Sequence, residues 1–114
     1  MAVIISDRDA VIACAGVSKK EYADKALSDE LESVIEGRSM YVWREGSTKY
    51  PAIADATGHY VSCAMPIISE GDVVGCVASL IEGGATRMKE SVSGEMESKL
   101  ILTAAGFLGK QLET

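Results

Sequence analysis

The chain has 114 residues, enough for one hydrophobic core and too few for two. Hydrophobic residues make up 47% of the sequence and charged residues 25%, which excludes a disordered chain. The formal net charge of −6 disfavours direct binding to nucleic acid, because proteins that grip a phosphate backbone present a basic surface. We therefore expect one globular domain that makes no DNA contact of its own.

The N-terminal segment and the cysteines predict a cytoplasmic protein. The start of the chain, MAVIISDRD, has no basic segment, and its apolar run is too short for a signal peptide or a membrane span. Cys14, Cys63 and Cys76 lie in apolar stretches without the spacing of metal ligands. We expect free thiols in a reducing compartment, with no membrane, no metal and no cofactor.

The first elements are predicted to be a short hairpin. Two apolar arms, Ala2–Ser6 and Ala10–Ala15, flank a polar DRD tip. Asp7 and Asp9 could also be read as metal ligands, but aspartate is favoured in turns for its own hydrogen bonding and no third carboxylate is identifiable nearby in the sequence. The turn is the preferred interpretation.

A helical region follows the hairpin. Ser18 and Glu21 have the spacing of a capping box, which is typical of a helix start. Ser28 with Asp29 offers a second start that would divide the region into two short helices, and Gly37 ends it. The apolar residues fall three or four apart and predict one buried face: Tyr22, Ala23, Leu27, Leu31, Val34 and Ile35.

The segment from residue 40 to residue 60 begins as a strand at Met40–Arg44 and continues as a long excursion rich in Gly, Pro and Thr. Long ordered loops in compact domains are often functional. Aromatic residues around it could line a small-molecule pocket, with an arginine as the partner of an anion. The predicted ligand residues are Tyr41, Trp43, Arg44 and Tyr60. The alternative is that these aromatic rings fill the core below the loop.

Two strands, about Tyr60–Ser69 and Val73–Glu82, are joined by a short SEGD turn. Cys63 and Cys76 fall on these neighbouring strands and would approach each other only if they share a face. Redox chemistry needs an accessible thiolate, and both cysteines have apolar neighbours, so packing is favoured. No serine in the sequence lies in a G-x-S-x-G or similar nucleophile motif that could act with His59. We therefore predict no catalytic residue.

The last predicted helix, beginning near Ser93, is apolar over more of its circumference than one sheet can cover. It could be buried by another helix of the same chain, but no third long helix is predicted. We therefore expect a homodimer or higher oligomer through this helix. The predicted interface residues are Leu100, Ile101, Ala104, Ala105, Leu108 and Leu112.

The predicted order β-β-α-β-β-β-α indicates an α+β fold. Three stretches carry a family resemblance: SDRDAVIACAGVSKKEYADKALSDELE, PIISEGDVVGCVASL and TAAGFLGKQLE. They are similar to the C-terminal GAF domain of the stage V sporulation protein T family. The resemblance covers most of the chain, and the segment from residue 38 to residue 60 matches poorly.

The resemblance implies one GAF-like domain over residues 1–114, with a central antiparallel sheet of about six strands, flanking helices and a pocket on one face. In that family the domain follows an N-terminal DNA-binding domain, and the whole protein is a sporulation transcription factor. Neither that domain nor the first GAF helix is recognisable here, so we expect any DNA binding to lie in residues absent from this chain. In the family the first helix would pack beside the last one, so it is an alternative cover for the apolar surplus of the last helix.

Three functions remain open from the sequence. The first is a regulatory domain that senses an unidentified small molecule and forms dimers. The second is a structural dimerisation module without a ligand. The third is an enzyme, since a GAF-type methionine-sulfoxide reductase uses three cysteines, the number found here. The third is disfavoured because Cys14 lies far in sequence from the other two.

Overall fold

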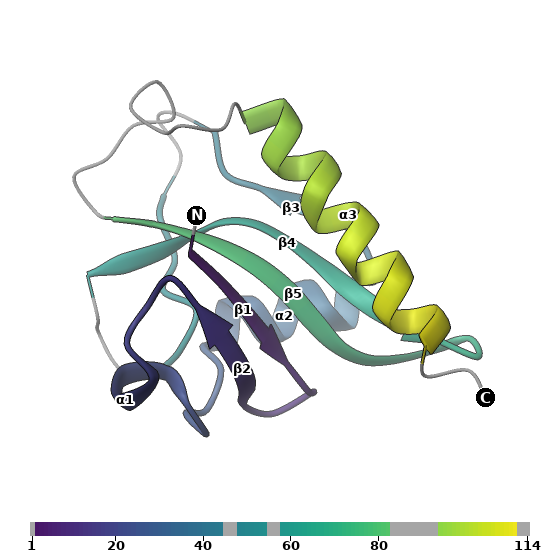
Figure 1. Ribbon diagram of the computed structural model, residues 1–114, viewed down its shortest axis with the longest axis horizontal. Coiled ribbons are helices and arrows are strands. Elements are labelled where there is room, and N and C mark those ends of the chain that lie inside the picture. The colour runs from purple at the N-terminus through teal and green to yellow at the C-terminus, as the bar shows by residue number, and fades with distance from the viewer. Residues whose placement is uncertain (1, 45–47, 55–57, 83–93, 112–114) are drawn as a thin grey trace.

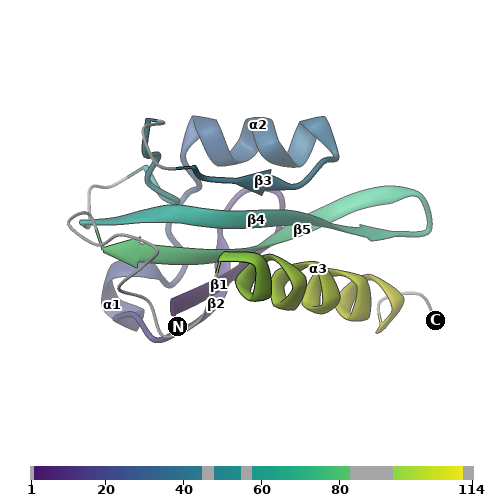
Figure 2. The same cartoon turned by 90° about the horizontal axis from the view of Figure 1, so that it is seen from above.

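The computed structural model describes residues 2–44, 48–54, 58–82 and 94–111. In these ranges the chain forms one antiparallel sheet with helices on both faces, as Figure 1 and Figure 2 show. The strand order is β2-β1-β5-β4-β3. The α+β class predicted from the sequence is confirmed.

The elements follow the predicted order. The strands are β1 (Ala2–Ser6), β2 (Val11–Ala15), β3 (Tyr41–Val42), β4 (His59–Ser69) and β5 (Asp72–Glu82). The helices are α1 (Lys19–Tyr22), α2 (Asp29–Gly37) and α3 (Gly94–Gln111). The described residues form five strands, so the sheet of about six strands implied by the family resemblance is not found in them.

The tight turns form where the sequence placed them, for identifiable chemical reasons. The Asp7 carboxylate accepts hydrogen bonds from the backbone N–H groups of Asp9 and Ala10, each at 2.8 Å, and so closes the β1–β2 turn. Between β4 and β5, Glu70 and Gly71 have positive φ angles of 52° and 85°. Two such residues in succession define the turn that matches the twist of a hairpin.

The helical region divides at Ser28, as the second cap signal indicated. The Ser28 hydroxyl accepts a hydrogen bond from the Leu31 N–H at 3.2 Å and caps α2. Ser18 precedes α1 but makes no side-chain capping bond, so the predicted capping box does not form. The Glu21 N–H, which the Ser18 hydroxyl would cap, instead donates to the backbone carbonyl of Ser18 at 3.1 Å.

Two hydrophobic cores lie on opposite faces of the sheet. The α2 face holds the larger one, in which Leu31 and Ile35 of α2 pack with Ile4, Val61 and Leu80 of the strands. The α3 face holds the smaller one. Its buried members are Cys63, Ile67, Val77, Ile101 and Ala105. Figure 2 shows the sheet edge-on between α2 and α3. Strands buried on both faces explain the nearly continuous apolar runs of β4 and β5.

Candidate functional site

The outer side of α3 is the first candidate site. Ile101 and Ala105 are buried against the sheet, so the side of the helix on which they lie is covered by the chain's own core. On other sides of the helix, Leu100 is 47% exposed, Leu102 is 49% exposed and Phe107 is 62% exposed. An exposed phenylalanine and two exposed leucines on one helix are unusual for a protein surface that faces only water.

The structure divides the predicted interface residues into distinct groups. Leu100 is exposed, and Ala104 and Leu108 are half-buried, whereas Ile101 and Ala105 belong to the core of their own chain. Leu112 lies outside the described residues. The side chains that a partner could reach therefore differ from the predicted set.

Phe107 was not among the predicted interface residues, although it is exposed on the same helix. Leu100, Ala104 and Phe107 are spaced i, i+4 and i+7, which places them along one side of the helix. We call these three residues the α3 seam. The spacing was visible in the sequence, but which stripe faces the sheet depends on how α3 docks.

The docking of α3 is fixed at its C-terminal end by a close approach to the β4–β5 hairpin. Gly109 is buried, and a Cβ atom there would collide with the carbonyl oxygen of Ile68. By contrast, a Cβ atom at Gly106 would meet nothing within 4 Å. The glycine at position 109 therefore sets how closely, and in which rotation, the helix lies on the sheet.

The predicted aromatic ligand site is the second candidate. Trp43 is buried, with the ammonium group of Lys49 5.3 Å from the centre of its ring. Tyr41 packs on the larger core and contacts Tyr50, with ring centres 5.9 Å apart. These contacts agree with the alternative hypothesis, in which the aromatic rings fill the core and do not line a ligand pocket.

The four predicted ligand residues point in different directions. Tyr41 lies on the α2 face of the sheet. Tyr60 precedes Val61, which packs on that same face, so the alternation of a strand directs Tyr60 toward the opposite face. Arg44 is exposed. The structure thus brings Tyr41 and Trp43 into the same region of the sheet without gathering all four around one described cavity.

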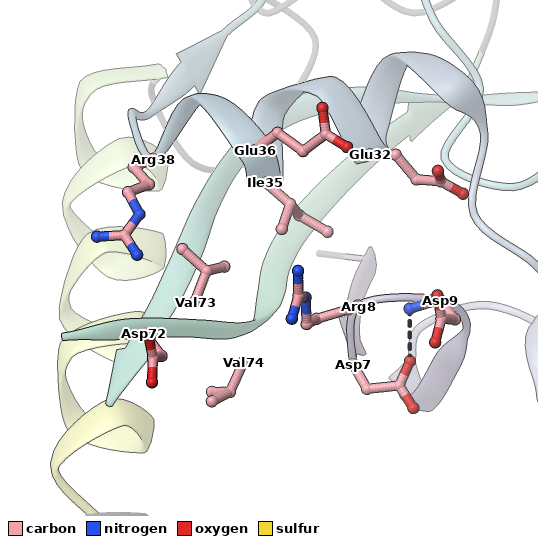
Figure 3. Close-up of a pocket in the computed structure, with 10 residues that line it drawn as sticks. All are labelled: Asp7, Arg8, Asp9, Glu32, Ile35, Glu36, Arg38, Asp72, Val73 and Val74. Atoms are coloured by element: carbon pink, nitrogen blue, oxygen red, sulfur yellow. Dashed lines mark hydrogen bonds between the residues drawn. The ribbon is translucent and has the colours of Figure 1, made fainter. Parts of the chain in front are cut away.

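An open groove of about 990 Å³ lies elsewhere, between the β1–β2 turn, α2 and the start of β5. Figure 3 shows its charged side chains around an apolar floor. Its lining residues are Asp7, Arg8, Asp9, Glu32, Ile35, Glu36, Arg38, Asp72, Val73 and Val74. None of the four predicted ligand residues lines this groove, which sequence analysis did not anticipate.

The cysteines and the histidine are placed apart from one another. Cys63 packs under α3 and Cys76 packs in the larger core, so these two cysteines lie on opposite faces of the sheet. Burial raises the pKa of the Cys76 thiol to about 12, which keeps it protonated. His59 is half-buried and meets Tyr22 edge-on, with ring centres 6.4 Å apart. This arrangement separates Cys63 from Cys76, so these two thiols do not share a face of the sheet.

The described residues offer neither a metal site nor a membrane-spanning helix. They contain no group of three or more His, Cys, Asp or Glu side chains placed to hold a metal ion. Among the helices in these ranges, none has both the length and the apolar character needed to cross a membrane.

Similarity to known proteins shows the family of this chain. The family described as "Stage V sporulation protein T C-terminal, transcription factor" matches residues 1–113. This chain belongs to that family. Stage V sporulation protein T of Bacillus subtilis (strain 168) is 34% identical over 113 residues, which cover 97% of this chain and 58% of the relative.

Membership of this stage V sporulation protein T family places the chain among C-terminal domains of transcription factors, and so supports a regulatory role. The chain spans only 58% of the length of its curated relative. Activities of the whole relative therefore extend to this chain only as proposals.

Proposed function

We propose that this chain is the GAF-like regulatory domain of a cytoplasmic sporulation transcription factor, and that it self-associates through the α3 seam. DNA binding would reside in a part of the protein outside this chain. The family match and the formal charge of −6 support this division, because an acidic domain is poorly suited to contact phosphates directly.

The observation that carries the proposal is the exposure of Leu100 and Phe107 on a helix whose opposite stripe is already buried. Full burial of a leucine or phenylalanine side chain contributes about 1.5–3 kcal/mol. A symmetric dimer buries each seam residue twice, because the same patch occurs on both protomers. Two half-exposed side chains on each protomer therefore offer a substantial driving force for association.

A small-molecule effector is the second part of the proposed regulation. A ligand changes the behaviour of a dimer only if it binds one conformational state better than another. The alternative is a structural module that dimerises without a ligand. In that case no small molecule would raise the unfolding temperature, whereas an effector at a hundred times its dissociation constant adds about 2.7 kcal/mol of stability.

Light scattering after size-exclusion chromatography tests the self-association. We expect the unmodified domain to have twice the 12.0 kDa mass of one chain, and Phe107→Glu to have the mass of a single chain. Ile12→Glu is the matched control, because Ile12 on β2 is 61% exposed, almost as much as Phe107, but lies off α3. A Phe107→Glu protein that remains a dimer would rule out the α3 seam as the interface.

A further inference from the structure

The groove beside α2 brings together three segments that are far apart in the sequence. The β1–β2 turn contributes Arg8, the end of α2 contributes Arg38, and the start of β5 contributes Asp72 and Val73. Its volume of about 990 Å³ is at the upper end of the range typical of small-molecule sites. The size suits a ligand larger than a single amino acid.

The charges of the groove are not neutralised by one another. Five carboxylates and two guanidinium groups line it, a formal charge of −3. Within the described residues, neither Arg8 nor Arg38 forms an ion pair with any of these carboxylates. Figure 3 shows the two arginines on different elements that line the groove, Arg8 on the β1–β2 turn and Arg38 at the end of α2.

Arg38 adopts an unfavourable backbone conformation to occupy its position. It follows the last residue of α2 with φ 55° and ψ 24°, the left-handed conformation in which glycine is the usual residue. A residue with a Cβ atom is strained there, and such strain tends to occur at functional positions. Glycine would suit the helix end better, but it would not supply a guanidinium group.

The chemistry of the groove defines the kind of ligand that fits. A guanidinium group binds a carboxylate through two parallel hydrogen bonds, and the carboxylates of Glu36 and Asp72 can bind an ammonium group. Ile35 and Val73, which both pack on the α2 face of the sheet, provide an apolar surface between them. The net negative charge disfavours a polyanion such as a nucleotide.

We propose that this groove binds a short peptide with a free ammonium and a free carboxylate terminus. The arginines hold the carboxylate, the acidic side chains hold the ammonium group, and the apolar floor receives an aliphatic side chain. The proposal rests on the proposed regulatory function, since it names the class of effector. The neighbouring residue Val74 packs on the core below α3, so the start of β5 links the groove to the face of the sheet that α3 covers.

A thermal-shift screen of tripeptides with free termini, followed by calorimetry on the best binder, tests the site. We expect binding to weaken about tenfold or more in Arg8→Gln, and similarly when the C-terminus of the peptide is amidated, because a hydrogen bond to a charged group is lost. Lys20→Gln removes an exposed charge from α1, outside the groove, and should leave the affinity unchanged.

Arg38→Gly separates a loss of binding from a loss of folding. Glycine relieves the strain at φ 55°, so this variant should unfold at the same or a higher temperature and yet bind the tripeptide about tenfold more weakly. Unchanged peptide affinity in both Arg8→Gln and Arg38→Gly would overturn the proposal. So would a screen in which no tripeptide binds, or in which only spermidine or inorganic phosphate does.

The two proposals can fail independently. If no peptide binds while Phe107→Glu still converts a dimer into single chains, the groove proposal alone is wrong. If the peptide binds to a domain that is always a single chain, self-association is wrong and the groove site remains.

Discussion

The two helices that cover the sheet differ in what they present to the outside. Each buries one apolar stripe, Leu31 with Ile35 on α2 and Ile101 with Ala105 on α3. The exposed side of α2 is acidic, with Glu30 and Glu36 among its residues, whereas α3 exposes Leu100 and Phe107. Outside the groove, the charged α2 surface is well solvated by water, whereas the apolar α3 surface is better suited to contact with another protein surface.

The largest expected effect on the free energy of unfolding comes from substituting a leucine on α2, compared with the same substitution on α3. Leu31 is 2% exposed and Leu100 is 47% exposed. Leu31→Ala should lower the free energy of unfolding by about 2–5 kcal/mol, because it leaves a cavity in the larger core. Leu100→Ala should cost less than about 1 kcal/mol in the single chain, since it removes little buried surface.

Urea unfolding at low protein concentration measures both leucine variants without contribution from association. If Leu100→Ala were as destabilising as Leu31→Ala there, Leu100 would be a core residue, and the contrast between the helices would be wrong.

The next effect tests how α3 is held on the sheet. Gly109→Ala places a methyl group against the Ile68 carbonyl and should destabilise the domain by about 1–3 kcal/mol. Gly106→Ala, three residues earlier, has free space and should stabilise the helix by about 0.5–1 kcal/mol. Opposite signs in urea unfolding support the docking described here, while equal effects would show that α3 sits in another rotation.

The smallest effect lies on the acidic side of the molecule and depends on pH. The backbone N–H groups of Asp9 and Ala10 hold the pKa of the Asp7 carboxyl below its ordinary value. The lowered pKa stabilises the fold above about pH 4, and this stability is lost as pH falls through the folded-state value. Because solvent screens the exposed carboxylate, we expect less than about 1 kcal/mol.

Asp7→Asn isolates this contribution, since its side-chain oxygen can still accept both hydrogen bonds but carries no charge. The free energy of unfolding of the two proteins should differ at pH 7 and converge as the pH falls below the folded-state pKa of Asp7. A difference that stays constant over this range would show that Asp7 acts through packing or turn geometry alone.

The sequence predicted most of the fold because its signals were local. The turn at Asp7, the cap at Ser28 and the turn at Glu70–Gly71 each depend on neighbours within three residues, and all three were found. The predicted capping box at Ser18 does not form, because the Glu21 N–H donates to the backbone carbonyl of Ser18 and not to its hydroxyl.

The candidate sites were harder to predict because they depend on tertiary contacts. The apolar surplus of the last helix was evident, but the rotation set by Gly109 decides that Phe107 faces outward while Ile101 faces inward. The groove combines side chains from three separate segments, so no single stretch of sequence contains its pattern.

The most direct test of self-association compares two side chains that are equally exposed in the single chain. Phe107 is 62% exposed on α3, and Ile12 is 61% exposed on β2. Radical footprinting at high and low protein concentration reports how solvent-accessible each one is. We expect Phe107 to become protected as the concentration rises while Ile12 stays equally reactive. If Phe107 stays as reactive at high concentration as at low, the α3 seam is not an interface.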